Sequence, residues 1–166
     1  MIRNLFDRLT PQSFKNFAII FCLAGDLIIS KFLWDRFSNR EQFNEYFQMS
    51  QLMIKEAFEA QGMTLPPNLE SEVFQILMQS LMLMIVLFVT FHLIIYLFYF
   101  LTKRFAFLYV RLLAWLGGFG AIAFSFSFFS VSAAWSLIFF MQFVFYLFCA
   151  IGFKYFPILP KKLQEQ

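Results

Sequence analysis

The chain has 166 residues, of which 61% are hydrophobic, 22% aromatic and only 14% charged, with a formal net charge of +3. Soluble globular chains are about 45–50% apolar and about 25% charged, and a domain this small cannot bury so much apolar surface. The composition therefore excludes a soluble enzyme, a nucleic-acid-binding protein and a disordered chain, and it predicts an all-α integral membrane protein.

Four apolar runs are long enough to cross a bilayer. A spanning helix needs about 20 mostly apolar residues, because the hydrocarbon core is about 30 Å thick. The runs are continuous, whereas the strands of membrane barrels alternate apolar and polar residues. We expect the four helices to pack as a bundle. The predicted spans are residues 14–34, 73–101, 105–129 and 133–153, with a cytoplasmic turn at 102–104 and an outer turn at 130–132.

Residues 1–13 precede the first span and carry apolar side chains at helical spacing. This pattern predicts a short interfacial helix that lies flat on the cytoplasmic side of the membrane. Thr10 and Pro11 then suit the N-cap and first turn of the helix that follows. The apolar positions are Ile2, Leu5, Phe6 and Leu9.

The loop of residues 35–72 is the only sizeable polar segment, and it predicts an amphipathic helix. Ser38 and Glu41 have the spacing of a capping box at its start, and Gly62 suits the position just after its end. The apolar face has three candidate partners: the membrane surface, the outer ends of the spans, or a neighbouring protein. It consists of Phe43, Tyr46, Phe47, Ile54 and Phe58.

The basic residues predict the orientation of the spans. Cytoplasmic segments of membrane proteins are rich in Lys and Arg. The 35–72 loop has three basic and seven acidic residues, so it is expected outside. We therefore expect a multi-pass protein of a bacterial inner membrane, with the N-terminus and the 154–166 tail in the cytoplasm. The basic residues assigned to the cytoplasmic side are Arg3, Arg8, Lys15, Lys103, Arg104, Lys154, Lys161 and Lys162.

One polar residue from each predicted span lies at a similar depth: Asp26, His92, Arg111 and Gln142. At 1.5 Å per residue, these lie about 10–18 Å from the cytoplasmic ends of their helices and form one intramembrane polar layer. One hypothesis is a proton or ion relay in which Asp26 and His92 titrate beside a fixed positive charge on Arg111. The other is a structural Asp26–Arg111 ion pair that fixes helix register. Arg111 can also extend toward the inner headgroups.

The third span carries a stripe of small residues at every fourth position: Gly117, Ala121 and Ser125. Such a stripe lets another helix approach closely. We interpret it as a packing face for another span or another subunit, and a hinge or pore-lining face is the functional alternative.

No catalytic, metal or cofactor motif is recognisable. One histidine and scattered methionines do not form a ligand set, and Cys22 and Cys149 are interpreted as packing residues. We therefore expect no cofactor and no nucleic acid, with the lipid bilayer and either further copies or other subunits as partners.

Three functional hypotheses follow. The first is a non-enzymatic assembly, regulatory or scaffold subunit that acts through helix packing and the outer amphipathic helix. The second is a homo-oligomeric ion or proton channel, or an ion-coupled transporter, that uses the Asp26, His92 and Arg111 layer. The third, with the least support, is an intramembrane enzyme in which His92 is a base.

Overall fold

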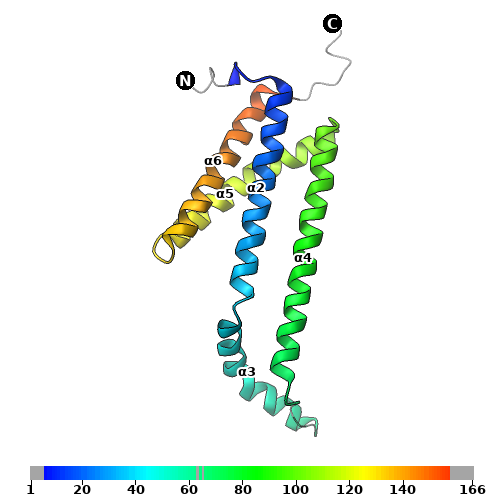
Figure 1. Ribbon diagram of the computed structural model, residues 1–166, viewed down its shortest axis with the longest axis vertical. Helices are drawn as coiled ribbons and strands as arrows, with labels where there is room; N and C mark the ends of the chain where they lie inside the picture. The colour runs from blue at the N-terminus through cyan, green and yellow to red at the C-terminus, as the bar shows by residue number, and fades with distance from the viewer. Residues whose placement is uncertain (1–5, 63, 65, 158–166) are drawn as a thin grey trace. The chain divides into compact units, whose positions relative to one another are not determined.

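Helices dominate the computed structural model, which describes residues 6–62, 64 and 66–157 (Figure 1). No strand occurs in this described part of the chain. Four of the helices, α2, α4, α5 and α6, are long and apolar enough to cross a membrane, which confirms that part of the prediction. The helices are α2 (Pro11–Phe37), α3 (Arg40–Ala60), α4 (Leu69–Phe100), α5 (Arg104–Phe128) and α6 (Ala133–Tyr155).

Side chains and turns fix where the helices begin. The Ser13 backbone N–H donates to the Thr10 hydroxyl at 3.1 Å, so Thr10 caps α2 as expected. Helix α3 is capped one residue later than the Ser38 capping box implied. Asn39 is the N-cap, and its side chain accepts from the Gln42 backbone N–H at 3.2 Å. An Asn side chain caps a helix as well as Ser does, which explains the shift.

Two of the turns contain a residue with a positive φ angle, a glycine in one and a threonine in the other. Gly62 follows α3 with φ +70°, as expected for the residue after a helix end. Thr102 has φ +60° after α4, although it is not a glycine. The backbone N–H of Lys103 donates to Phe98 O and that of Thr102 donates to Tyr99 O. These two bonds form a Schellman motif, which closes α4 and starts α5 within three residues.

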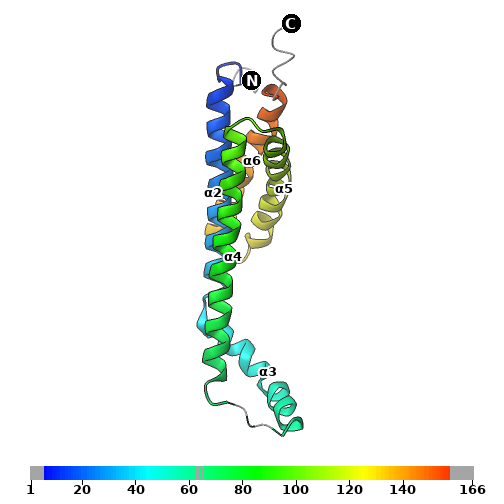
Figure 2. The same ribbon diagram turned by 90° about the vertical axis from the view of Figure 1, so that its right-hand side faces the viewer.

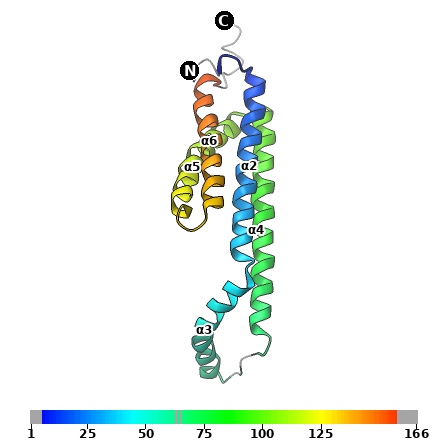
Figure 3. The same cartoon turned by 60° about the vertical axis from the view of Figure 1, so that its left-hand side comes forward.

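The described residues belong to two units, residues 1–28 with 89–166 and residues 29–88. In the first unit, α5 and α6 form an antiparallel hairpin (Figure 3). Near its turn the two helices exchange hydrogen bonds: Ser125 Oγ donates to Ser136 O at 2.9 Å, and Ser136 Oγ donates to Ser125 O at 2.9 Å. A hydroxyl bound to a facing backbone carbonyl needs close helix approach, which small residues permit.

Aromatic rings fill much of the core of the first unit. Phe6 is 3% exposed, and its ring stacks on Tyr155 and Phe148 of α6, with centroids 5.0 and 5.2 Å away. Part of the expected interfacial segment therefore packs on α6. Residues 1–5, which complete that prediction, lie outside the described residues.

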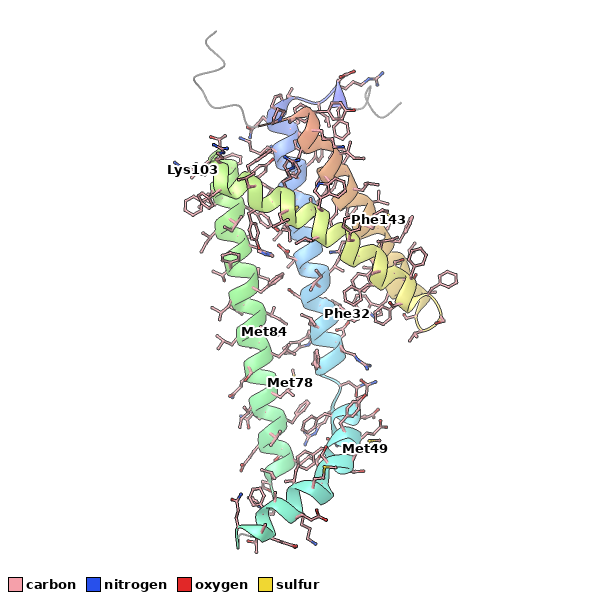
Figure 4. All side chains as sticks on the ribbon, turned by 180° about the vertical axis from the view of Figure 1, so that it is seen from behind. Phe32, Met49, Met78, Met84, Lys103 and Phe143 are labelled. Atoms are coloured by element: carbon pink, nitrogen blue, oxygen red, sulfur yellow. The ribbon has the colours of Figure 1, made fainter. Side chains whose placement is uncertain are left out.

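The second unit contains the end of α2, helix α3 and the first part of α4 (Figure 2). The Phe43 ring of α3 lies 5.1 Å from the Phe74 ring of α4, and the Arg40 guanidinium lies 5.6 Å from the same ring. Figure 4 shows Met78 and Met84 among the side chains of α4 and Met49 on α3. Aromatic and cation–π contacts thus join α3 to α4 within this unit.

Candidate functional site

Asp26 is the central residue of a buried polar cluster in the first unit. Its side chain is 1% exposed. Its carboxylate oxygen Oδ1 lies 2.8 Å from His92 Nδ1, and Oδ2 accepts a hydrogen bond from the Tyr96 hydroxyl at 2.5 Å. Both oxygens of the carboxylate therefore contact a donor-bearing group of α4, which offsets part of the cost of burying the charge.

His92 extends this cluster to a third helix. Its Nε2 atom lies 2.7 Å from the hydroxyl of Tyr109 on α5. When Nδ1 carries the proton that faces Asp26, Nε2 accepts the Tyr109 hydroxyl proton. We call the four residues Tyr109, His92, Asp26 and Tyr96 the Asp–His–Tyr chain, because each contacts the next through polar side-chain atoms 2.5–2.8 Å apart.

The Asp–His–Tyr chain is buried at its centre and more exposed at one end. Asp26, His92 and Tyr96 are 1–3% exposed, whereas Tyr109 is only half-buried. No Lys or Arg of the described residues forms an ion pair with Asp26, and the ion pairs away from His92 are Lys31–Asp35 and Lys55–Glu59. The contacts described for the Asp26 carboxylate are therefore those with His92 and Tyr96.

Gln142 and Tyr146 of α6 lie beside the residue that precedes Asp26. A Cβ atom placed on Gly25 would lie 2.7 Å from Tyr146 Cζ and 2.8 Å from Gln142 Nε2. Gln142 is 1% exposed, and its Oε1 has no hydrogen-bond partner among the described residues. Three of the four predicted polar residues, Asp26, His92 and Gln142, thus lie in one buried region.

The fourth predicted polar residue, Arg111, lies outside this buried region. Its side chain is exposed on α5, whereas Asp26 pairs with His92. The expected Asp26–Arg111 ion pair is therefore wrong for the described structure. The physical reason is the rotation of α5, which turns Tyr109 and Val110 toward the core and Arg111 outward. Depth along a helix, from which the layer was predicted, does not specify this rotation.

The small-residue stripe of α5 lies against α6. A Cβ atom on Gly117 would lie 2.7 Å from Tyr146 Cε2, and Ser125 bonds to Ser136. Ala121, between them, is 4% exposed. The neighbour of this stripe in the described structure is thus another helix of the same chain.

The predicted apolar face of α3 is split between inner and outer positions. Phe43, Phe47, Ile54 and Phe58 are partly buried, whereas Tyr46 is 62% exposed. Met49 and Met53, at the next positions on that side of the helix, are each 75% exposed. We call Tyr46, Met49 and Met53 the α3 outer stripe.

No metal or redox centre is evident in the described part of the chain. It holds no group of three or more His, Cys, Asp or Glu side chains that could bind a metal ion. Cys22 and Cys149 are both buried and not in a disulfide. The chemistry available to the Asp–His–Tyr chain is acid–base: carboxylate, imidazole and hydroxyl groups can each accept and give a proton.

Sequence reasoning missed the tyrosines of this site. Tyr96 lies four residues after His92, and Tyr146 lies four residues after Gln142, so each shares a helix face with a predicted polar residue. That spacing is the signal that could have found them. Comparisons with protein-family models, with curated proteins and with solved structures found no match.

Proposed function

We propose that this protein is a small, non-enzymatic multi-pass membrane protein that binds a proton at the Asp26–His92 pair and passes it on. The observation that carries this proposal is the row of contacts through Tyr109, His92, Asp26 and Tyr96: a hydrogen bond at each end and a 2.8 Å contact between His92 Nδ1 and Asp26 Oδ1 in the middle. Ionisable residues within membrane spans commonly mark ion pathways and proton relays. The proposal covers a homo-oligomeric proton channel and a proton-coupled transporter.

The charge balance of the pair supports proton binding. An isolated charge in a hydrocarbon environment is costly, and no described Lys or Arg side chain offsets Asp26. A carboxylate beside a neutral imidazole carries one negative charge, and one added proton makes the Asp26–His92 pair neutral overall. Without that proton the pair carries one negative charge, so uptake and release of a single proton is the natural reaction of the site.

In this proposal Tyr109 relays protons between the Asp26–His92 pair and the less buried side of the cluster. It is the least buried member of the Asp–His–Tyr chain, and its hydroxyl contacts His92 directly. A hydroxyl that donates to one neighbour and accepts from another can relay a proton without carrying a lasting charge. In this account Arg111 has no part in the relay.

Proton flux into liposomes that contain the purified protein tests the proposal. Asp26→Asn and His92→Gln should each lower the flux at least about tenfold, which corresponds to about 1.4 kcal/mol in the barrier. Asp35→Asn is the matched carboxylate control, because Asp35 pairs with Lys31 outside the cluster. It should keep wild-type flux.

A further variant distinguishes loss of proton flux from loss of folding. Tyr109→Phe removes only the half-buried end of the Asp–His–Tyr chain, so it should elute like wild type in size exclusion and still lose flux. Wild-type flux in Tyr109→Phe and His92→Gln, or no flux from well-folded wild-type protein, contradicts the proposal.

A second candidate function, an assembly, regulatory or scaffold subunit, is favoured by the α3 outer stripe. Exposed apolar side chains that lie next to one another on a helix with a polar surface can form an interaction site. Met49→Glu with Met53→Glu should release the partner subunit from complexes extracted in mild detergent, and Gln48→Glu with Gln51→Glu should not. Native mass spectrometry of the extracted complexes gives the answer. Identical masses for all variants contradict this candidate.

We also propose that both termini face the cytoplasm of a bacterial inner membrane. The support is the distribution of charge: the 35–72 loop is strongly acidic, whereas the segments assigned to the other side carry eight basic residues.

A further inference from the structure

Arg111 is a charged side chain on the outer surface of an apolar helix. Helix α5 is long and apolar enough to span a membrane, and Arg111 lies seven residues after its start at Arg104. The side chain is exposed and takes part in none of the ion pairs of the described residues. A guanidinium is always protonated, so this position presents a permanent positive charge toward the lipid.

Arg104 lies on the same face of α5. Seven residues are nearly two full helical turns, which places the two arginines about 10 Å apart along the axis and almost in line. Leu108 lies between them and Trp115 one turn beyond, at 53% and 37% exposure. One outward stripe of α5 therefore carries two arginines with Leu108 between them and Trp115 beyond them.

We propose that this stripe binds an anionic phospholipid, with the phosphate between Arg104 and Arg111 and the acyl chains beyond Arg111, along Trp115. Guanidinium groups bind phosphate with two parallel hydrogen bonds, and an arginine about two turns inside a span can extend its side chain to the headgroup level. Lys103, labelled in Figure 4 at the turn before α5, adds a third positive charge at the headgroup end.

The order of residues favours a lipid over a carboxylate of another protein. Positive charge lies at the start of α5 and apolar side chains follow it deeper into the span, which is the order of headgroup and acyl chain in a phospholipid. The first turn of α5 contains no acidic residue that would repel the phosphate.

Tryptophan quenching by brominated lipids tests this proposal. Trp34→Phe and Trp135→Phe leave Trp115 as the only tryptophan. In mixed bilayers, brominated phosphatidylglycerol should quench Trp115 more strongly than the same fraction of brominated phosphatidylcholine. Basic residues near a membrane surface each attract anionic lipid by about fivefold, and the preference should fall by about that factor in Arg111→Gln and in Arg104→Gln.

The controls make each outcome decisive. Lys154→Gln removes an exposed basic residue at the end of α6, so it should keep the lipid preference. Arg104→Gln lies at a helix start and tests the site even if Arg111→Gln folds poorly. Equal quenching by both lipids overturns the proposal. Absence of quenching by either lipid overturns it as well, because another protein chain then covers the stripe.

Discussion

At the residue scale, the hydroxyl of Tyr96 is the group that distinguishes the buried cluster from ordinary aromatic packing. It donates to Asp26 at 2.5 Å, whereas Tyr99, also buried on α4, makes no such contact with Asp26. Tyr96→Phe should therefore lower the free energy of unfolding by about 1.5–3 kcal/mol, as expected for a hydrogen bond to a charged group. Tyr99→Phe should cost clearly less.

Denaturant titration of both variants in detergent micelles measures this difference. Equal losses from the two substitutions would show that Asp26 does not depend on the Tyr96 hydroxyl.

The candidate site was only partly predictable at this scale. Asp26, His92 and Gln142 stand out because each is a polar residue in an apolar run. The tyrosines do not, since 22% of the chain is aromatic. Arg111 was predicted to belong to the buried polar layer because the sequence gives its depth in the span. The sequence does not give the rotation of α5, which depends on tertiary packing.

At the element scale, α5 and α6 depend on close approach at Gly117. A Cβ atom there would lie 2.7 Å from Tyr146 Cε2, and one on Gly120 would meet nothing within 4 Å. Gly117→Ala should therefore destabilise the protein through overpacking, by about 1–3 kcal/mol. Gly120→Ala should be neutral or stabilising by up to about 1 kcal/mol, because alanine is the better helix former.

Thermal unfolding in detergent compares the two glycine variants directly. A smaller ring at position 146, in Gly117→Ala with Tyr146→Leu, should recover part of the loss. Equal unfolding temperatures for Gly117→Ala and Gly120→Ala would contradict the packing of Tyr146 against Gly117.

Helix identity was more predictable than helix ends. Long apolar runs left no alternative to four helices of membrane-spanning length, because hydrocarbon offers no partner for free backbone groups. The start of α3 moved from Ser38 to Asn39, since neighbouring residues of similar capping strength compete. The left-handed Thr102 had no sequence signal, because this position normally favours glycine.

At the scale of the whole molecule, orientation in the membrane is the property that the charge distribution predicts most strongly. Gln51 on α3 and Lys103 before α5 are both exposed, and the proposal places them on opposite sides. In a Cys22→Ala and Cys149→Ala background, Gln51→Cys should react with an impermeant thiol reagent added outside intact cells. Lys103→Cys should react only after the cells are permeabilised, and the reverse pattern would overturn the assignment.

The central claim is that Asp26 and His92 share a proton that can exchange. It can be tested directly by spectroscopy because His92 is the single histidine of the sequence. Nitrogen-15 NMR of histidine-labelled protein in bilayers reports which ring nitrogen is protonated. We predict a proton on Nδ1, an Nε2 that accepts from Tyr109, and a nitrogen spectrum that Asp26→Asn alters. A proton on Nε2 alone, with a spectrum unchanged by Asp26→Asn, would contradict the account.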